Sequence, residues 1–386
     1  MDAPASVEEA LEGAEGLAAR ARKEVDDGLL PSCQWALALD GEVIAGATVG
    51  EVPAGESSRY IIYSCTKAVV ASAIWQVLAE GSLRLDERVG DRIPEFATNG
   101  KEGITVEQVL LHTSGFPHAP LPLADWGSRE ARLQAFSRWR LNWEPGTAFE
   151  YHATSAHWVL AELLERIDGV DFRAAVQRRV IEPLGLRSLQ LGVPEDQQGD
   201  IALPRTVGEP ATPQEWQEAL GVAGFDLGEV TDEALVAMAA PSSLEAGVPG
   251  GGGISTAADL ARFYQALLHD PAGLWGPDVL ADATGHVRNT LPDRQTGVPA
   301  NRALSIVVAG DDGRAAFRGF GHTTSPRAFG HGGAGGQIGW ADPETGISFA
   351  WVTNGLDAHL LRQWRRTAGI ASRAGRVGTA LAGSSP

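Results

Sequence analysis

Lysine, cysteine, methionine and tyrosine are scarce in this sequence. Its 386 residues include three lysines against 28 arginines, two cysteines, two methionines and four tyrosines. Two cysteines are too few for a disulfide framework or a cysteine-based structural zinc site. We therefore expect a protein without disulfides, and nothing in the composition calls for a metal or cofactor.

Charge and hydropathy exclude further classes. The formal net charge is −18, whereas nucleic acids and anionic membrane surfaces attract basic proteins. No apolar run is long enough to span a membrane, and the acidic start "MDAPASVEEALEG" lacks the apolar core of a signal peptide. We expect a cytoplasmic protein that acts on a small-molecule substrate and has no nucleic-acid or membrane partner; the oligomeric state stays open.

One of the three lysines follows a serine at a spacing that suits catalysis. In "IIYSCTKAVV", Ser64 and Lys67 are three residues apart. Arginine stays protonated at any accessible pH, whereas a desolvated lysine can lose its proton and act as a base. Lys67 is thus a candidate base for Ser64. With three lysines, however, about one sequence in six would contain this spacing by chance.

Periodicity and turn residues predict strands near both ends and helices between them. Helical spacing occurs over residues 7–27, 65–80 and 356–374, and in "TVEQVLLH", "SREARLQAFSRW", "SAHWVLAELLERIDG" and "STAADLARFYQALLHD". Strands are expected in "CQWALALDGEVIAGATVG", "RALSIVVAG" and "GGQIGWADPETGISFAWVTNG", with hairpin turns at Asp40-Gly41 and at residues 342–346.

This order of elements predicts two lobes. Residues 1–63 and 254–386 would together form a sheet-containing α/β lobe, and residues 64–253 a mainly helical lobe inserted between them. Within the helical lobe, residues 192–249 are rich in glycine and proline and poor in periodicity, which suits a segment that wraps a surface or a cleft. An active site would lie in the cleft between the lobes.

The predicted helix start and a nearby tyrosine supply two further catalytic groups. If Ser64 opens the helix over residues 65–80, the helix N-terminus offers a free N–H where an oxyanion would form. Tyr151, in "FEYHATSAHWVL", comes just before a helix start, where its phenol could protonate a leaving group. Taken alone, Tyr151 fits a core tyrosine with a satisfied hydroxyl at least as well.

A glycine-rich segment near the carboxyl end marks a close approach of the backbone. "FGHGGAGGQIGW" contains G-x-G-x-x-G, but the motif leads into a strand and no βαβ unit surrounds it, so we reject dinucleotide binding. Glycines on a strand instead indicate that another group comes close to its backbone. A substrate could pair with this strand edge, and one N–H here could complete an oxyanion hole.

Five segments then carry a family resemblance. "SCTK", "LLHTSGF", "YHA", "GGGGISTAADLARF" and "HGGAGG" occur in the order and spacing of the serine β-lactamase and penicillin-binding-protein superfamily. Over residues 28–355 the sequence most resembles the branch that holds class C β-lactamases and family VIII carboxylesterases. The resemblance implies an α+β fold of the β-lactamase/transpeptidase type, an antiparallel sheet flanked by helices with an inserted all-helical lobe.

The resemblance also implies a role for each motif residue. Ser64 would be the nucleophile that forms an acyl-enzyme, Lys67 its base, and Tyr151 the group that passes the proton to the leaving group. The backbone N–H groups of Ser64 and Ala334 would form the oxyanion hole. His331 stands where β-lactamases usually have the lysine of Lys-Thr-Gly.

Two departures from the family pattern weaken recognition of a β-lactam. Ala153 replaces the asparagine of Tyr-x-Asn, which removes an amide that contacts the substrate. His331, Gly332 and Gly333 replace Lys-Thr-Gly, which removes a fixed positive charge and a hydroxyl. We expect His331, Gly332 and Gly333 to contact the substrate. Esterases of the superfamily tolerate such changes in both motifs.

Other candidate residues have structural interpretations. Cys65 should point into packing, and His112 in "LLHTSGF" is expected to be a structural hydrogen-bonding residue. His152 and His157 lie five residues apart, off a shared helical face, and lack a third ligand, so no metal site is predicted.

A proline-rich loop, "FPHAPLPLADWG", follows one of the motifs. Its Trp126 and His118 could form a lid over the acyl pocket and contact the substrate.

The sequence thus predicts a serine hydrolase that cleaves carboxylic esters of small or medium acyl groups. A β-lactamase, an amidase, a D-amino-acid peptidase or an acyltransferase would use the same acyl-enzyme. A non-catalytic sensor with this fold would have no need for the rare Lys67. An ordinary α/β-hydrolase is excluded because the chain contains no G-x-S-x-G.

Overall fold

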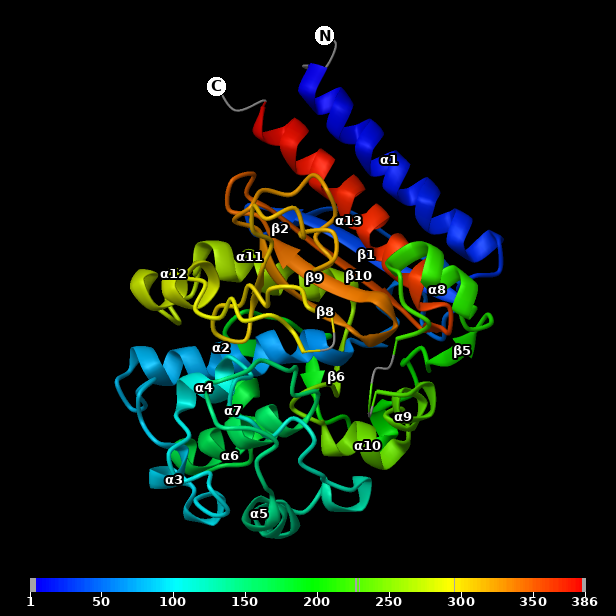
Figure 1. Cartoon of the computed structure of the whole chain (residues 1–386). Coiled ribbons are helices and arrows are strands. Elements are labelled where there is room, and N and C mark those ends of the chain that lie inside the picture. The colour runs from blue at the N-terminus through cyan, green and yellow to red at the C-terminus, as the bar shows by residue number, and fades with distance from the viewer. Residues whose placement is uncertain (1–4, 226–227, 229, 295, 384–386) are drawn as a thin grey trace.

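A computed structural model describes residues 5–225, 228, 230–294 and 296–383 of the chain. Its largest sheet has six strands in the order β2-β1-β10-β9-β8-β7, all antiparallel (Figure 1). Its strands are β1 (Ser32–Leu39), β2 (Glu42–Gly50), β7 (Val307–Val308), β8 (Phe329–Gly333), β9 (Gln337–Ala341) and β10 (Ile347–Thr353). Strands from the two ends of the chain therefore pair at the centre of the sheet, where β1 lies beside β10.

Strands β1, β9 and β10 are buried on both faces of this sheet, and alternate residues of each strand face opposite sides. On one face, Trp35 and Trp351 pack with α1 (Ala5–Asp26) and α13 (Leu360–Ala382). On the other face, Ala36 and Ala350 pack with α11 (Ala257–His269). This explains why strands β1 and β10 contain apolar residues at nearly every position.

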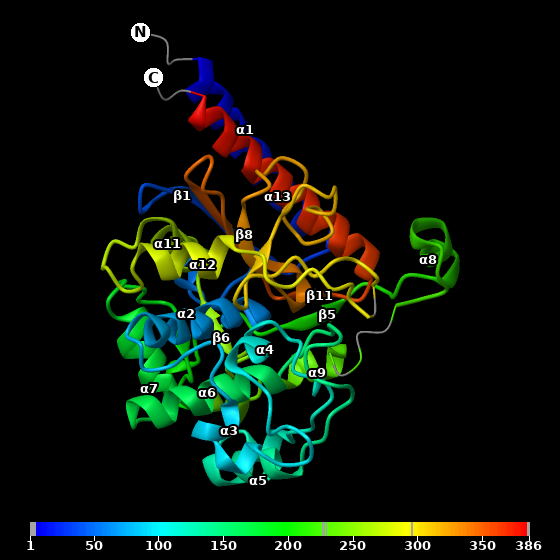
Figure 2. The same cartoon turned by 60° about the vertical axis from the view of Figure 1, so that its left-hand side comes forward.

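Helices α1 and α13 form an antiparallel pair across the first face (Figures 1 and 2). A Cβ on Gly13 would lie 2.8 Å from Val377 Cγ2, so the two helices pack closely there. Towards the other end of the pair, the buried Arg366 donates from Nε to Glu24 at 2.5 Å and from Nη2 to Asp357 at 2.7 Å. The pair is thus held by apolar packing and by a buried, paired charge.

The helical part of the chain surrounds α2 (Thr66–Ala79), which is buried along almost its whole length. Helices α6 (Ser155–Asp168), α7 (Phe172–Val176) and α12 (Pro277–Gly285) pack against it. The other helices of this region are α3 (Val89–Arg92), α4 (Val106–Leu110), α5 (Arg129–Arg138), α9 (Asp232–Ala237) and α10 (Pro241–Ala246). Helix α8 (Pro213–Leu220) projects from the body of the molecule in Figure 2. The division into two lobes at the boundaries given above stays a prediction.

Two small sheets connect these regions. One has the order β3-β6-β4 and the other pairs β11 with β5 in parallel. Their strands are β3 (Tyr60–Ile61), β4 (Gln190–Leu191), β5 (Arg205–Val207), β6 (Gly253–Ser255) and β11 (Gly355–Asp357). Strand β3 leads directly into the segment that carries Ser64, so the first small sheet fixes the entry to that segment.

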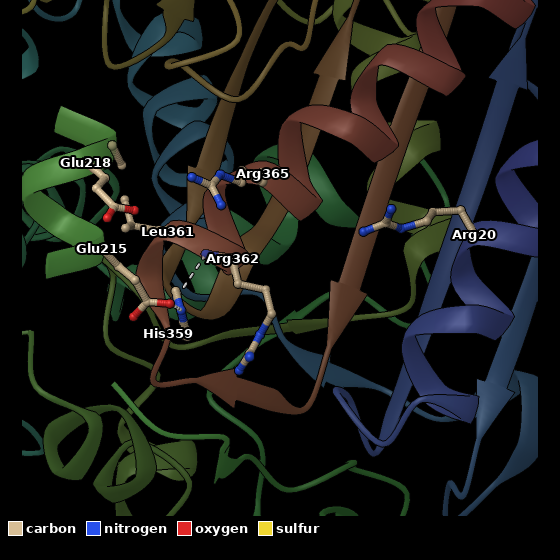
Figure 3. A pocket seen from close by; sticks show the side chains of 8 residues that line it. Arg20, Glu215, Glu218, His359, Leu361, Arg362 and Arg365 are labelled. Atoms are coloured by element: carbon tan, nitrogen blue, oxygen red, sulfur yellow. Dashed lines mark hydrogen bonds and ion pairs between the residues drawn. The ribbon is translucent and has the colours of Figure 1, made fainter. Parts of the chain in front are cut away.

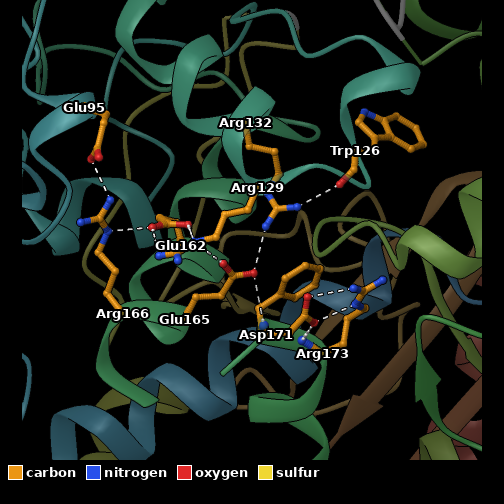
Figure 4. A network of polar contacts seen from close by, with 10 residues as sticks. Glu95, Trp126, Arg129, Arg132, Glu162, Glu165, Arg166, Asp171 and Arg173 are labelled. Atoms are coloured by element: carbon orange, nitrogen blue, oxygen red, sulfur yellow. Dashed lines mark hydrogen bonds and ion pairs between the residues drawn. The ribbon is translucent and has the colours of Figure 1, made fainter. Parts of the chain in front are cut away.

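An ion-pair network joins α5 to α6 (Figure 4). Arg129 contacts both Glu162 and Glu165 at 2.7 Å, and Arg132 donates to Glu165 at 2.9 Å. Arg166 extends the network by bonding Glu162 at 2.7 Å. Both glutamates are almost fully buried, and such carboxylates are tolerated because each is paired with arginine.

Several local predictions are confirmed. The turn at Asp40-Gly41 has φ of 50° and 84° and joins β1 to β2 as a hairpin. Thr105 caps α4 with a full capping box, and Gly169 ends α6 in the left-handed conformation. The predicted fold class, an antiparallel sheet with helices, is also confirmed.

Two element predictions were wrong. Most of "RALSIVVAG" is not a strand, because Asn301 and Ser305 take positive φ of 48° and 61° and turn the chain, which leaves only β7. The closing helix does not begin at residue 356, since Leu356 pairs with Thr206 in β11, and the helix runs from Leu360 to Ala382. None of the helices in the described ranges is long and apolar enough to cross a lipid bilayer.

Candidate active site

Ser64 lies in a 3-10 turn, Tyr63–Cys65, immediately before α2. Tyr63 has a positive φ of 43°, which is unusual for an aromatic residue, and two hydrogen bonds stabilise this conformation. Its hydroxyl donates to the Leu235 carbonyl at 3.1 Å, and its carbonyl accepts from Thr66 Oγ1 at 2.6 Å. The turn leaves Ser64 half-buried while its neighbours are buried.

Lys67 is fully buried, and its Nζ contacts three oxygen atoms. It donates to the backbone carbonyls of Ala153 at 2.6 Å and Gly250 at 2.5 Å, and it lies 3.2 Å from Ser64 Oγ. Carbonyl oxygens only accept hydrogen bonds, so these two carbonyls orient two N–H bonds of Nζ. As an ammonium, Lys67 can donate to Ser64; as a neutral amine, it can direct its lone pair at the Ser64 hydroxyl. This is the geometry that a base for Ser64 requires.

The glycines before α11 make room for this contact. A Cβ on Gly250 would lie 3.1 Å from the Ala153 carbonyl and 3.3 Å from Lys67 Nζ, and a Cβ on Gly253 would lie 2.7 Å from Thr66 Oγ1. The backbone of this segment therefore approaches α2 more closely than a side chain would permit. The sequence offered no signal for the Gly250 carbonyl as a site group, since every residue carries one.

Tyr151 lies above Lys67 and Ser64. Lys67 Nζ is 4.9 Å from the centre of the Tyr151 ring. The Tyr151 hydroxyl is buried close to Ser64 without a hydrogen bond of ordinary geometry to any described residue. Burial raises the pKa of Tyr151, and the Arg302 charge and the nearby Ser64 hydroxyl oppose that rise. Tyr151 is therefore a phenol at neutral pH and can give a proton.

His331 is buried, and both of its ring nitrogens have polar partners. Its Nδ1 lies 2.6 Å from the Gly332 carbonyl and its Nε2 lies 3.4 Å from Arg302 Nη1. Because the carbonyl only accepts and the guanidinium only donates, Nδ1 carries the proton and Nε2 accepts. Burial, followed by the Arg302 and Lys67 charges, holds the pKa of His331 well below its usual value. His331 is thus neutral and does not replace the lysine charge of Lys-Thr-Gly.

Strand β8 passes beside the Ser64 turn. A Cβ on Gly333 would lie 2.6 Å from the Ile62 carbonyl, and Cys65 donates from Sγ to the His331 carbonyl at 3.1 Å. Gly332, Gly333 and Ala334 follow and are half-buried. The glycines of "HGGAGG" therefore fit the interpretation of close backbone approach, here to the turn that carries the nucleophile. The role of the Ala334 N–H in an oxyanion hole stays a prediction.

One charged group of the site escaped the sequence analysis. The Arg302 guanidinium carbon lies 5.1 Å from the centre of the Tyr151 ring and 5.6 Å from that of Phe149. The side chain is buried and approaches His331 from the segment before β7. No motif surrounds Arg302, which is the first residue of "RALSIVVAG", a segment expected to be a strand.

Two predicted lid residues lie in different environments. Trp126 is buried, and its Nε1 donates to the Leu121 carbonyl at 3.1 Å; its place in a lid over the acyl pocket stays a prediction. The proline-rich loop folds inward there because the Trp126 carbonyl also accepts from the buried Arg132 at 3.0 Å. His118 is exposed, and its Nε2 lies 2.9 Å from Glu150, the residue before Tyr151. A substrate contact by His118 stays a prediction.

Three histidines pack behind Tyr151. His112 lies 4.9 Å from Tyr151 and 5.9 Å from His157, measured between ring centres. His152 donates from Nδ1 to the Glu150 carbonyl at 2.7 Å and accepts the Phe116 N–H at 3.1 Å, and burial lowers its pKa to about 3. Within the described ranges, no group of three or more His, Cys, Asp or Glu side chains could hold a metal ion.

Elsewhere, a surface pocket lies between α8 and the start of α13 (Figure 3). Glu215 and His359 contact each other at 3.3 Å in this pocket, and Arg365 points towards it. None of the residues that line it belongs to the segments that carry Ser64, Tyr151 or His331. The chemistry described above therefore lies outside this pocket.

Comparisons with known proteins agree with this geometry. Residues 17–371 match the β-lactamase family. The esterase/β-lactamase LipL of Mycobacterium tuberculosis is 28% identical over 347 residues, which cover 84% of this chain and 77% of that protein. A penicillin-binding-protein homologue from Caulobacter crescentus has a TM-score of 0.74 and 28% identity, covering 93% of this chain and 97% of that chain.

A family VIII carboxylesterase has a TM-score of 0.75 over 94% of this chain and 97% of that chain, and at 22% identity it shows a likeness of fold. The five motifs, the arrangement of Ser64 and Lys67 beside the sheet, and the match over almost the whole sequence lead to one conclusion: the chain belongs to the β-lactamase family.

Proposed function

We propose that this protein is a serine hydrolase that cleaves carboxylic esters of small or medium acyl groups through an acyl-enzyme on Ser64. The observation that carries the proposal is the position of Lys67 Nζ, held by two backbone carbonyls and 3.2 Å from Ser64 Oγ. An ordinary serine hydroxyl is a poor nucleophile, and a base in hydrogen-bond contact removes its proton as it attacks.

The steps follow from the arrangement of the three side chains. Ser64 Oγ attacks the ester carbonyl while Lys67 takes its proton, and the backbone N–H groups of Ser64 and Ala334 stabilise the oxyanion. Tyr151 gives its proton to the departing alkoxide and recovers one from Lys67. Water then attacks the acyl-enzyme with the same groups acting in reverse.

Three observations favour an ester over a β-lactam. Ala153 has no side-chain amide, and its carbonyl is occupied by Lys67. His331 is neutral and is already engaged by Arg302 and Gly332. LipL is named an esterase/β-lactamase, and a carboxylesterase shares the fold. The cytoplasmic location stays a prediction from the sequence.

A direct comparison of substrates tests this proposal. Each missing hydrogen bond to a charged or buried group reduces stabilisation of the transition state for β-lactam cleavage by roughly 1.5–3 kcal/mol, which lowers the rate by about one to two powers of ten. We expect kcat/KM for short p-nitrophenyl esters to exceed that for nitrocefin by at least about a hundredfold. Ala153→Asn combined with His331→Lys should narrow the difference. If nitrocefin is hydrolysed as efficiently as the best ester, the protein is a β-lactamase instead.

A further inference from the structure

Arg302 is a buried arginine that forms no ion pair with the residues that the structure describes. Its side chain belongs to a residue that is 8% exposed, and none of the ion pairs between described residues involves it. Other buried arginines of the described chain do have carboxylate partners: Arg59 with Asp200, Arg132 with Glu165, and Arg366 with Glu24 and Asp357. Burial lowers the pKa of Arg302 more than the Asp293 charge raises it. A buried guanidinium without a carboxylate in direct contact is costly, so a functional reason is expected where one is found.

The guanidinium is held against the catalytic tyrosine. It lies over the Tyr151 ring and donates from Nη1 to His331 at 3.4 Å. The backbone of Arg302 exchanges hydrogen bonds with Asn289 at 3.0 and 3.1 Å, which fixes the position from which the side chain extends. Its Nε is buried without a hydrogen-bond partner in the described residues. Arg302 therefore contributes a fixed positive charge at a defined place.

We propose that Arg302 is a positioning residue for Tyr151, supplying from another part of the chain the fixed positive charge that the segment His331-Gly332-Gly333 lacks. The inference rests on the proposed role of Tyr151 as proton carrier. His331 itself does not supply this charge, because burial and then the Arg302 charge hold its pKa well below the usual value.

The charge acts during proton transfer. When the Tyr151 O–H bond breaks and the proton forms the alcohol product, the phenolate oxygen is negative until it takes the proton from the Lys67 ammonium. A nearby cation stabilises that phenolate. Burial raises the pKa of Tyr151, and among the neighbouring charges Arg302 opposes this rise most strongly.

Other groups also face Tyr151 and share in its titration. They come from every element packed against it, namely Ser64 and Cys65 from the nucleophile turn, Lys67 from α2, His112 from the loop after α4, and His331 from β8. His112 and His331 are neutral because burial and the Arg302 charge lower their pKa values. Arg302 and Lys67 are thus the two cations beside Tyr151, and the experiment must distinguish their effects on the Tyr151 phenolate.

The test compares Arg302→Gln with Arg302→Lys, and uses Arg132→Gln as a matched control. Arg132 is also buried and also lies over two rings, those of Trp158 and Phe172, but it belongs to the α5–α6 network. With p-nitrophenyl acetate, a neutral ester, we expect Arg302→Gln to lower kcat by about 10- to 100-fold and to change KM less than about threefold. Arg302→Lys should recover most of this loss. Arg132→Gln should lower thermal stability without this pattern.

A chemical rescue addresses the tyrosine directly. The chain has four tyrosines, so all can be replaced by 3-fluorotyrosine, whose phenol is more acidic. A more acidic phenol needs less help from a cation, so the activity of Arg302→Gln relative to its parent should rise by at least about threefold. No such gain is expected for Arg132→Gln. A structural role for Arg302 would not respond to the acidity of a phenol.

A third measurement needs no turnover. In the Ser64→Ala background, the His331 ring signals can be followed by NMR and assigned with His331→Gln. Removing Arg302 should shift the titration of His331 to higher pH, because its largest opposing charge is gone. The NMR titration reports on Arg302 even if the protein is not an ester hydrolase. Failure of a phosphonate to label Ser64 would show separately that the proposed function is wrong.

Three results would overturn the proposal. If Arg302→Gln raises KM only for esters whose acyl group carries a carboxylate, Arg302 binds substrate. If Arg302→Gln and Arg132→Gln lose stability and activity alike without rescue by fluorotyrosine, Arg302 is structural. If Arg302→Gln does not fold, Arg302→Lys decides: this variant keeps the positive charge, so a fall in kcat as large as that expected for the neutral side chain would contradict the proposal.

Discussion

Replacing Lys67 by arginine keeps a positive charge at the centre of the site but removes a base. The guanidinium keeps its proton at any accessible pH, so it cannot accept the proton of Ser64. It is also larger than an ammonium, and the space around Nζ is limited, since a Cβ on Gly250 would already lie 3.3 Å away. We therefore expect Lys67→Arg to lower the acylation rate and to disturb the packing around Gly250.

The magnitude follows from the contacts. Loss of general-base catalysis costs about 10²–10⁴ in rate, so we expect kcat/KM for p-nitrophenyl acetate to fall by about a thousandfold, which equals about 4 kcal/mol of transition-state stabilisation. Lys67→Met should lose as much activity. It also leaves the carbonyls of Ala153 and Gly250 without a hydrogen-bond donor, which lowers the free energy of unfolding by about 1–3 kcal/mol for each carbonyl. Part of this loss is offset because the variant no longer buries an ammonium group.

The assay is pre-steady-state acylation together with urea unfolding, and the chain offers a matched control. Lys101 is also fully buried, and its Nζ donates to the carbonyls of Thr98 at 2.7 Å and Trp139 at 2.6 Å. Lys101→Met should lower the free energy of unfolding as Lys67→Met does, yet leave the acylation rate within a few-fold of the parent. Acylation by Lys67→Arg at a near-normal rate would refute the reasoning and reduce Lys67 to a packing or electrostatic role.

Three further predictions follow from contacts and pKa values described above. A phosphonate should label the peptide that contains Ser64, and label that persists in Ser64→Ala would exclude this nucleophile. Gly333→Ala should lower kcat at least tenfold, because its Cβ would lie 2.6 Å from the Ile62 carbonyl and push β8 from the nucleophile turn, whereas Gly103→Ala, with open space around it, should not. The pKa of His152 is about 3 in the folded protein and about 6.5 in the unfolded chain. Between these values the unfolded chain binds more protons, so the free energy of unfolding decreases as the pH is lowered. When the pH is lowered from 6.5 to 5, protonation of this histidine in the unfolded chain should lower the free energy of unfolding by about 2 kcal/mol. If urea unfolding shows that His152→Gln loses as much stability over this pH range as the parent, the assignment to His152 is contradicted.

The parts of the site that could be read from the sequence are those carried by local motifs. Ser64 and Lys67 share one helix start, so their contact depends only on helical geometry. Tyr151 precedes the cap of α6, and its place was predictable from the motif even though its distance to Lys67 was not. The hairpin turn at Asp40-Gly41 and the cap at Thr105 were predictable for the same reason, because each depends on a few adjacent residues.

The parts that were missed depend on tertiary contacts. The carbonyls of Ala153 and Gly250 hold Lys67, and a backbone carbonyl has no signature in the sequence. Arg302 lies 29 residues before His331, in a segment whose direction is set by positive φ angles, so no spacing rule relates the two. The pKa of His331 could not be predicted either, because it is set first by burial and then by the Arg302 charge, and both depend on tertiary contacts.

The pairing of β1 with β10 also determines when this protein can fold during synthesis. Cys33 pairs with Thr353, so the centre of the sheet joins segments from the two ends of the chain. At about 5–20 residues per second, a ribosome needs roughly 15–60 s to make the residues between them. Throughout that interval the nascent β1–β2 hairpin exposes an unpaired edge and two apolar faces, which is the condition that favours aggregation and binding by chaperones. Since β8 and β9 also come late, Ser64 and Lys67 emerge early but have no β8 beside them until the last strands arrive.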